Sequence, residues 1–436
     1  MRHAASLLLI VCVLLAALPL SGCGEQALDL FFPEASPTPT AEPTSTPTPT
    51  PEPTPDPAEL ARQRESAEKR ASLMEKARTL SDGYFYAEAS ALLREEPTLQ
   101  NEETDALLAE ILAEQEALVP YTGELRHIFF HSLIVYPEMI FRDLETPMGG
   151  YNSGFSEKAE LERILPQLYE RGYVLYDLED CFEIRDGQAR RKEILLPPGK
   201  TPLILSVDDV AYAYGEGFAS RLYVDENGAL LYEVPNPQGG VDIMPDGDVM
   251  GVVDAFVQEH PDFSYRGHKG TIALTGFQGA FGYGDYDDPA CQPLIAEVAE
   301  ALKADGWNFA SHSYTHNNGS YGFWGSGCIP EKIEYDINKW VDRVTPWIGE
   351  THLFIAPFGY RAHDDALRHI LNAGFDVYCT VDDHVVNELN GDHALMSRIE
   401  IGGYSLRKYK ELLREYFFEP DDVLDTAGRP PLADWE

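Results

Sequence analysis

From about residue 125 onward, short runs of apolar residues alternate with longer stretches in which apolar residues recur at helical spacing. The short runs predict seven strands, at 127–134, 201–207, 270–275, 307–311, 352–356, 375–381 and 396–401. The longer stretches predict helices at roughly 156–171, 247–259, 290–305, 330–347, 362–373 and 405–416. Because alternating strands and helices are typical of a parallel sheet, we expect an α/β fold, a distorted (β/α)7-type barrel.

A different pattern interrupts this alternation between Asp209 and about residue 246. Two strand-like runs in the segment 221–234 flank the dipeptide Asn227-Gly228. Asn-Gly between two such runs is a strong signal for a tight turn. The segment therefore predicts a β-hairpin inserted into the barrel.

The first part of the chain has a separate organisation. Residues 58–118 are rich in Ala, Leu, Glu and Arg with apolar residues at helical spacing, which predicts three short helices forming a helical spacer. Residues 24–57 form a Pro/Thr-rich linker, in which proline at nearly every second position of 36–57 favours an extended polyproline II stalk over a packed core. The catalytic domain is expected at 122–436.

Residues 1–23 have the features of an export signal. Arg2 and His3 precede the apolar stretch 4–20, which suits the core of a signal peptide. The sequence Leu20-Ser21-Gly22-Cys23 resembles a bacterial lipobox, which implies that Cys23 becomes a lipidated N-terminus and anchors the protein outside the cytoplasm at the cell membrane. The alternative is an ordinary secretory peptide, which would leave Cys23 as an unmodified thiol.

The net charge limits the classes of binding partner, and the cysteine spacing limits the kinds of metal site. Lys and Arg total 33 against 73 Asp and Glu, a net charge of −40, which argues against nucleic-acid binding. Four cysteines remain beyond residue 23, with no CxxC spacing of the metal-binding kind: Cys181, Cys291, Cys328 and Cys379. Free thiols and a disulfide are both consistent with this sequence.

Polar residues follow the predicted strands at the end where a parallel barrel carries its catalytic loops. His131 lies within or just past the first strand, Asp208 and Asp209 follow the second, and His312 and His316 follow the fourth. Further positions follow the fifth and sixth strands: Pro357, Phe358, Gly359, Asp382 and Asp383. This convergence predicts one site at the carboxyl ends of the strands.

Asp209, His312 and His316 form a ligand set suited to a divalent metal, with coordination positions left for water and a substrate oxygen. Adjacent carboxylates repel each other, and a metal on Asp209 relieves this repulsion. The same set would hold iron in an oxygenase. Hydrolysis is favoured because a second carboxylate, Asp208, has an obvious task as a general base.

Three motifs resemble those of the polysaccharide deacetylases, carbohydrate esterase family 4. Ser206-Val-Asp-Asp-Val resembles Thr-Phe-Asp-Asp-Gly, the run His312-Ser-Tyr-Thr-His316 resembles His-Ser/Thr-x-x-His, and Ile355-Ala-Pro-Phe-Gly resembles Arg-x-Pro-Tyr-Gly. The resemblance covers roughly 125–416. It implies that Asp208 is the base, that Asp209, His312 and His316 bind the metal, and that Phe358 contributes an oxyanion-hole N–H. It also implies zinc as the probable cofactor and an N-acetylglucosamine-containing polysaccharide as substrate.

The sequence departs from this family at three points. Ile355 stands where many members have the arginine that orients the base, and Val210 replaces a glycine. The usual C-terminal acid is absent, and residues 397–400 occupy its place. The strand around His131 resembles the N-terminal strand of the permuted poly-N-acetylglucosamine deacetylase-like subgroup, which makes His131 the candidate general acid. The alternative for His131 is a hydrogen-bonded core histidine.

Other residues have weaker assignments. Arg398 or Arg361 is a candidate for the missing base-orienting arginine, although either also suits an ordinary ion pair. Asp382 and Asp383 either orient an acid or belong to a polar loop. Five aromatic residues in glycine-rich loops are candidates for stacking on sugars or for loop packing: Trp324, Tyr321, Phe323, Tyr283 and Phe281.

The expected function is metal-dependent removal of N-acetyl groups from amino sugars of an envelope or extracellular polysaccharide. Two alternatives use the same fold. One is a catalytically weak carbohydrate-binding surface lipoprotein, which the missing arginine and acid suggest. The other is an O-acetyl esterase acting on another glycan.

Overall fold

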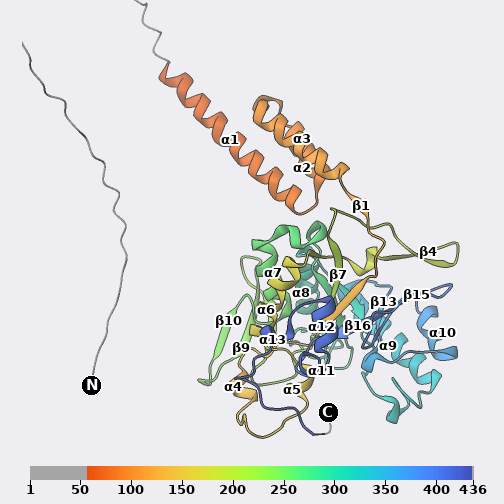
Figure 1. Ribbon diagram of the computed structural model, residues 1–436. Helices are drawn as coiled ribbons and strands as arrows, with labels where there is room; N and C mark the ends of the chain where they lie inside the picture. Colours follow the sequence, from red (N-terminus) through yellow and green to blue (C-terminus); the bar gives the residue numbers. More distant parts are fainter. Residues whose placement is uncertain (1–55, 435–436) are drawn as a thin grey trace, which may run out of the picture. The chain divides into compact units, whose positions relative to one another are not determined.

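The computed structural model describes residues 56–434 (Figure 1). Contacts group Pro57–Glu436 into one compact unit, distinct from Met1–Asp56. The signal peptide 1–23, the lipidation of Cys23 and the linker to residue 55 lie outside the described residues and stay predictions. Within residues 56–434, no helix has both the length and the apolar composition that a membrane span requires.

Seven parallel strands close into a barrel, as predicted. They are β2 (Arg126–Phe130), β7 (Thr201–Asp208), β11 (Gly270–Leu274), β12 (Trp307–Ser311), β13 (Leu353–Ile355), β14 (Val377–Val381) and β16 (Ala394–Glu400). Their order around the barrel is β11, β12, β13, β14, β16, β2 and β7, and a β11–β7 pairing closes the ring. Each predicted strand coincides with an observed one to within a few residues.

Two additional short strands distort the barrel. β3 (Tyr173–Leu175) pairs with the first residues of β7, whereas β11 pairs with the last. β15 (Asn387–Leu389) pairs antiparallel with the first half of β16, whereas β2 pairs with its last two residues. The ring of strands therefore closes near the carboxyl ends of β7 and β16, where the polar motifs lie.

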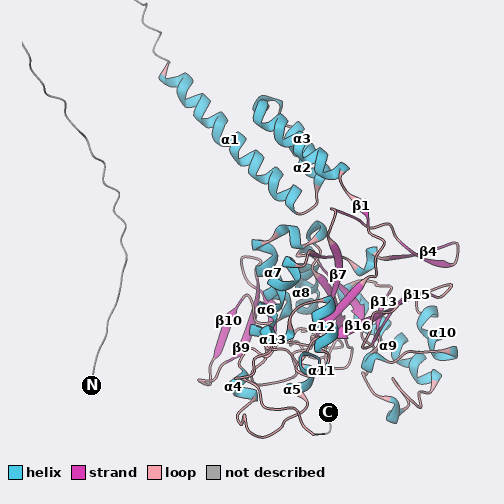
Figure 2. Ribbon diagram, in the orientation of Figure 1, coloured by secondary structure: helices cyan, strands magenta, loops and turns pink. Residues whose placement is uncertain are grey.

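Helices lie outside the strands (Figure 2). The predicted helical stretches form α6 (Lys158–Glu170), α7 (Val249–Glu259), α8 (Gln292–Ala304), α9 (Pro330–Ile348), α10 (Asp364–Asn372), α11 (Ser405–Lys408) and α12 (Lys410–Tyr416). Short helices α4 (Pro137–Ile140), α5 (Tyr151–Gly154) and α13 (Pro420–Val423) were not predicted. Each has only four residues, too few for a helical period to show in the sequence.

Three helices occupy the N-terminal segment, as predicted: α1 (Pro57–Asp82), α2 (Tyr86–Arg94) and α3 (Glu102–Glu116). α1 has 26 residues and is longer than expected. The Tyr84 hydroxyl, after α1, donates a hydrogen bond of 2.7 Å to the Asp262 carbonyl. Val174 of β3 belongs to the same buried cluster as the apolar residues of these helices, so the helices pack on the barrel.

The predicted inserted hairpin is part of a three-stranded antiparallel sheet of β8 (Arg221–Val224), β9 (Leu230–Pro235) and β10 (Val241–Met244). β10 was missed because it is a short edge strand whose apolar residues, Val241 and Ile243, face solvent. Two further two-stranded sheets pair β1 (Val119–Pro120) with β6 (Leu195–Leu196) and β4 (Phe182–Arg185) with β5 (Gln188–Arg191).

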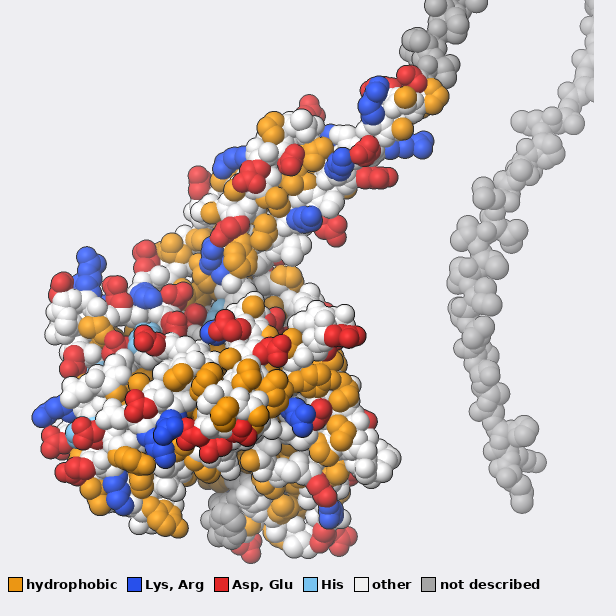
Figure 3. All heavy atoms as spheres, turned by 180° about the vertical axis from the view of Figure 1, so that it is seen from behind, with side chains coloured by type: hydrophobic (Ala, Val, Ile, Leu, Met, Phe, Trp, Pro, Cys, Tyr) orange, Lys and Arg blue, Asp and Glu red, His pale blue; other side chains and the backbone are white. Residues whose placement is uncertain are grey.

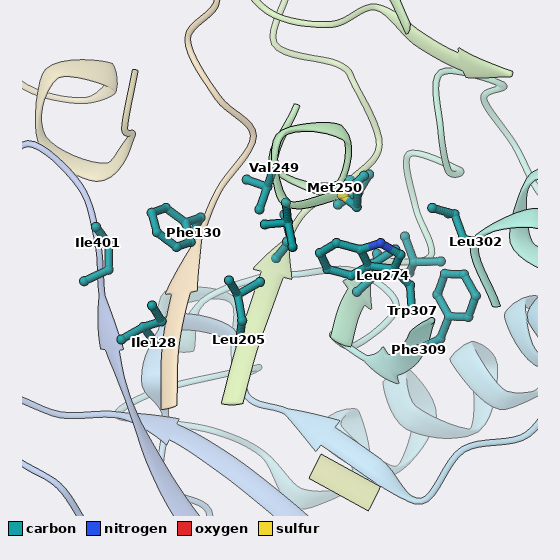
Figure 4. Close-up of a cluster of buried hydrophobic side chains, with 14 of the residues drawn as sticks. Ile128, Phe130, Leu205, Val249, Met250, Leu274, Leu302, Trp307, Phe309 and Ile401 are labelled. Carbon is teal, nitrogen blue, oxygen red and sulfur yellow. The ribbon is translucent and has the colours of Figure 1, made fainter. Parts of the chain in front are cut away.

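Alternation along the strands separates an outer core from the barrel interior. In β7, Leu203, Leu205 and Val207 belong to the cluster that packs against the helices, and Leu205 lies beside β2 and α7 in Figure 4. Ile204 belongs to the interior cluster. The parity of β7 therefore directs Ser206 and Asp208 into the barrel.

The interior cluster contains several small residues: Ala273, Ala310 and Ala394. Cys181 and Cys379 are buried, Cys291 and Cys328 are half-buried, and all four are free thiols. On the surface drawn in Figure 3, acidic side chains are spread over the face with Lys and Arg among them.

Two carboxylates at the start of α6 share one cation. Glu157 and Glu160 are buried beside Arg429, with 3.2 Å between Glu157 Oε1 and Arg429 Nε and 2.6 Å between Glu160 Oε2 and Arg429 Nη2. Burial, followed by the negative charge of Glu160, raises the pKa of Glu157 to about 8 from 4.5, although Arg429 acts in the opposite direction. Glu157 is therefore protonated in the folded protein at neutral pH.

A pH dependence of stability follows. The Glu157 carboxyl retains its proton in the folded protein, whereas the unfolded chain releases it above pH 4.5. The contribution of this proton to the free energy of unfolding is therefore complete below pH 4.5 and is lost as the pH rises through about 8. We expect Glu157→Gln to remove a slope of up to about 1.4 kcal/mol per pH unit from urea-unfolding free energies between pH 5 and 8. Glu162→Gln, a half-exposed glutamate on the same helix, is the control. Equal slopes in wild type and Glu157→Gln would contradict the assignment.

Candidate active site

The carboxyl ends of the barrel strands surround a pocket of about 320 Å³. Its lining includes Phe129, His131, Asp208, His312, His316, Ala356, Phe358, Gly359, Val381, Arg398 and Glu400. Of the site residues predicted from separate parts of the sequence, His131, Asp208, His312, His316, Phe358 and Gly359 belong to this lining, whereas Pro357, Asp382 and Asp383 do not. Asp209 lies beside His312 and His316.

Asp209, His312 and His316 are placed to share a metal ion. One potential ligand atom from each lies within 4.8 Å of the others. The Nδ1–H of His312 donates to the Ile355 carbonyl at 2.8 Å, which leaves Nε2 available as a ligand. Burial, followed by the neighbouring His312, lowers the pKa of His316 to about 4, so its imidazole is in the neutral form that binds metals. The donor set and its protonation therefore fit a divalent metal.

A second group, Asp382, Asp383 and His384, also has ligand atoms within 4.8 Å of one another. These residues are consecutive in one loop after β14, and Asp383 and His384 are exposed. His384 pairs with both carboxylates, at 2.6 Å to Asp382 and 2.9 Å to Asp383. Of the two interpretations left open for Asp382 and Asp383, the polar loop agrees with these contacts.

Backbone strain concentrates at the site. Asp209, His316 and Phe358 have φ values of 61°, 49° and 55°, in the left-handed region that residues other than glycine rarely adopt. Asp209 adopts this conformation directly after the end of β7. The side chains of Asp208 and Asp209 therefore leave the strand in different directions. Strained residues of this kind cluster at functional sites because the surrounding structure holds them in place.

Arg398 forms the strongest polar contact in the pocket. Its Nη1 and Nη2 donate to Asp208 Oδ1 and Oδ2 at 2.7 and 2.9 Å, and both side chains are buried. Burial alone would raise the pKa of Asp208, but the charges of Arg398 and then His312 outweigh it, and the net pKa lies below its usual range. Asp208 is thus an ionised carboxylate held by a bidentate arginine.

Of the two arginines left open as partners of Asp208, Arg398 makes the contact. The other candidate, Arg361, is exposed and pairs with Glu388. The sequence analysis did not choose between Arg361 and Arg398, although the alternation of side chains along β16 indicates which of the two faces the barrel interior. Arg398 has the parity of Met396, an interior residue of β16, so its side chain enters the barrel.

Two buried polar residues inside the barrel, Ser206 and His127, form a hydrogen-bonded chain with Arg398. Its Nη1 also donates to Ser206 Oγ at 3.1 Å, so the Ser206 hydroxyl is free to donate to His127 Nε2 at 2.9 Å. Burial, followed by the charge of Arg398, lowers the pKa of His127 well below its usual value. His127 is therefore a neutral acceptor, and the arginine is the single positive charge of this group.

His131 lies just past β2. It precedes Asp208 in the chain, whereas the candidate metal ligands follow it. Its Nδ1–H donates to the Gly154 carbonyl at 3.0 Å, and the Glu400 carboxylate lies 3.6 Å from the same nitrogen. The ring is a pocket residue with about a fifth of its side chain exposed. His131 is thus hydrogen-bonded, as the core-histidine alternative requires, and it also lines the pocket, as a general acid requires.

Glu400 was not identified as a site residue from the sequence. It ends β16 with the inward parity of Arg398 and lines the pocket. Burial raises its pKa, while the charge of His131 opposes this. It occupies the segment that replaces the family's C-terminal acid.

Phe358 lies in a single 3-10 turn, Pro357–Gly359, directly after β13. N–H groups in a first helical turn have no intrahelical partner, as an oxyanion-hole donor requires. The residue is 58% exposed, and its ring centroid lies 4.5 Å from that of His316. Phe358 thus lines the pocket beside a metal-ligand candidate.

The other aromatic candidates divide into three groups. Trp324 and Phe281 are buried, in agreement with the loop-packing alternative. Tyr283 and Phe323 are half-buried. Tyr321 is 66% exposed and remains available for a ligand.

No family model matches the chain, and no curated protein is similar to it. Among solved structures, the Streptococcus pyogenes deacetylase PplD in complex with acetate is 13% identical, over 71% of this chain and 99% of that chain, with a TM-score of 0.39. A de-N-acetylase from Aggregatibacter actinomycetemcomitans is 13% identical over 64% and 96%, with a TM-score of 0.39. IcaB from Ammonifex degensii is 12% identical over 65% and 94%, with a TM-score of 0.37.

These structures include deacetylases, the kind of protein that the motifs resemble. At such identities and TM-scores, the likeness supports no conclusion about the reaction of this chain. Its own strands and side chains define an α/β barrel with a candidate metal-hydrolase site at the carboxyl face.

Proposed function

We propose that this protein is a metal-dependent polysaccharide deacetylase that removes N-acetyl groups from amino sugars of a cell-envelope or extracellular polysaccharide. One observation carries the proposal: the Asp208–Arg398 ion pair and the Asp209, His312 and His316 set meet at one pocket. A carboxylate base beside a three-ligand metal position is the arrangement that water-dependent acyl transfer needs.

The residues divide the reaction between them. A divalent metal, with zinc the preferred ion for this donor set, would be held by Asp209, His312 and His316 and would polarise the amide oxygen and activate water. Asp208 takes a proton from the attacking water as its oxygen bonds to the acetyl carbon. The Phe358 N–H stabilises the developing oxyanion. His131, in its imidazolium form with Nδ1–H held by the Gly154 carbonyl, donates its Nε2 proton to the sugar nitrogen as the C–N bond breaks, which yields acetate and a free amine. The proton taken up by Asp208 then returns to the imidazole through solvent.

The Asp208–Arg398 pair favours an enzyme over the catalytically weak binding protein. The sequence suggested that alternative through the missing base-orienting arginine, and Arg398 supplies a guanidinium from another strand. Export and lipid anchoring through Cys23 complete the proposal and place the enzyme where extracellular polysaccharide is accessible.

A substrate panel tests the reaction class. The metal-loaded protein is incubated with N-acetylglucosamine oligomers and with acetylated xylan, and acetate and free amines are measured. We expect equal amounts of acetate and amine from the oligomers. Acetate from xylan alone would support the O-acetyl esterase, and oligomer binding without acetate would support the binding protein.

Removal of one ligand tests the metal site. We expect His312→Ala to weaken zinc affinity by more than about 100-fold, because even outer-shell partners of metal ligands contribute 10 to 100-fold. His363→Ala, at an exposed histidine paired with Asp364, is the control and should bind as wild type does. Metal content after dialysis at low free zinc gives the result. Full occupancy in His312→Ala would exclude this ligand set.

A further inference from the structure

The C-terminal residues 429–431, here called the C-terminal strap, lie against the loop 148–156 (Figure 1). The Met148 N–H donates to the Pro431 carbonyl at 3.0 Å. Asn152 Nδ2 donates to the carbonyls of Pro430 and Pro431 at 3.0 and 3.1 Å. Asn152 is fully buried, and its Nδ2 also donates to the Met148 carbonyl at 2.9 Å, so the strap supplies two of the three acceptors of this amide.

Arg429 anchors the strap. Its side chain is fully buried, and Nε and Nη2 donate to the Glu160 carboxylate at 2.9 and 2.6 Å. The same guanidinium reaches the backbone of the loop, with Nη2 at 2.8 Å from the Phe155 carbonyl and Nη1 at 3.4 Å from that of Asn152. One buried cation therefore fixes both ends of residues 152–155 relative to α6.

This loop in turn holds His131. The Gly154 carbonyl, between the two carbonyls that Arg429 contacts, accepts the Nδ1–H of His131 at 3.0 Å. The Phe155 ring centroid lies 5.1 Å from that of His131. A carbonyl only accepts, so this bond sets the proton on Nδ1 and fixes the orientation of the ring. Moving the loop would therefore move the imidazole.

The metal ligands are held independently of the strap. Asp209 follows β7, and His312 and His316 follow β12. In the described part of the chain, no hydrogen bond or ion pair joins residues 429–431 to any of these three. The strap thus acts on one half of the site.

We propose that the C-terminal strap is a positioning element for His131, which acts through the loop 148–156 to set turnover without contributing to metal binding. Arg429 is its main positioning residue. The inference rests on the proposed function, in which His131 protonates the leaving nitrogen. Removing the C-terminus would then convert an active deacetylase into a metal-bound protein with a misplaced proton donor.

Three stop positions near the C-terminus test this inference in otherwise intact, zinc-loaded protein. Ending the chain after Pro431 retains every strap contact described above and is the control. Ending it after Arg429 removes the two proline carbonyls, and ending it after Gly428 removes the arginine as well. A displacement of about 1 Å in a catalytic group costs up to about 100-fold in rate. We expect kcat on N-acetylglucosamine oligomers to fall about tenfold and about 100-fold in the two shorter proteins, with zinc content and KM unchanged.

The leaving group separates positioning from general damage. An amide nitrogen must be protonated to leave, whereas p-nitrophenolate leaves without a proton. With p-nitrophenyl acetate, both shorter proteins should retain wild-type rates within about twofold, and His131→Ala should show the same contrast between the two substrates. Because loss of Arg429 leaves the Glu160 carboxylate buried without its cation, Arg429→Lys and the milder truncation provide the result if the shortest protein does not fold.

The outcomes are distinct. Equal losses on both substrates, loss of zinc, or no loss on the oligomers while the wild type is active would overturn the role of the strap. Absence of acetate release by the wild-type protein from either substrate would instead refute the proposed function, and this inference with it.

Discussion

Asp208→Asn is expected to lower the rate of acetate release roughly 10³-fold while zinc remains bound, since general-base catalysis contributes about 10² to 10⁴. The amide has nearly the shape of the carboxylate but does not accept the proton of the attacking water. Asp209, His312 and His316 are unchanged, so metal content should match that of the wild type. Acetate release by zinc-loaded protein at saturating oligomer is the measurement.

Asp382→Asn is the matched control for this change. Asp382 is a carboxylate after another barrel strand, β14, where it pairs with His384 outside the pocket lining. Its loss should leave the rate within about twofold, because surface substitutions away from a site have small effects. Full activity in Asp208→Asn would rule out the proposed mechanism.

Arg398→Met is expected to destabilise the protein by about 3 to 5 kcal/mol, because it leaves the Asp208 carboxylate buried without its partner. The side chains of Arg398 and Asp208 are only 1% and 3% exposed, so solvent compensates little. Activity should fall as well, since the carboxylate loses the fork that orients it. Urea unfolding at pH 7 measures the free energy, and acetate release measures the rate.

Arg361→Met provides the comparison within the same chain. Arg361 also pairs with a glutamate, but 54% of its side chain is exposed, and we expect a change within about 0.5 kcal/mol. The double change Arg398→Met with Asp208→Asn removes both buried charges and should recover stability but not activity. Equal stability of Arg398→Met and Arg361→Met would contradict the buried ion pair.

The barrel was predictable because its strands are buried on both faces. Apolar runs such as 201–207 and 307–311 stand out against amphipathic helices, and each matches an observed strand closely. β3 and β15 escaped prediction because they are three residues long and pair with half of a neighbouring strand. Their existence depends on how the barrel closes, which no local pattern encodes.

Residues next to a motif were predicted, whereas of those that reach the site through strand pairing, Arg398 was left open as one of two candidates and Glu400 was missed. Asp208 and His312 lie in recognisable runs, and both line the pocket. Arg398 and Glu400 reach it from β16, where their neighbours in the sequence carry no motif. The alternation of side chains along β16 would have placed both of them inside the barrel. A charge buried there requires an opposite charge nearby. Choosing Asp208 as the partner of Arg398 required the strand order.

The loop that holds His131 was the least predictable part of the site. Gly154, Asn152 and Arg429 are separated from His131 by 21 to 298 residues along the chain and are brought together only by the fold. Nothing in the Pro430-Pro431 sequence indicates that the carbonyls of these two residues accept hydrogen bonds from the buried Asn152 amide.

The most direct test of the account is acetate release from N-acetylglucosamine oligomers by chelator-treated protein before and after zinc is restored. The account predicts no release from the metal-free protein and, with one zinc per chain, release of one acetate for each new amine. Undiminished release after complete removal of metal, or oligomer binding with no acetate at full zinc occupancy, would contradict it.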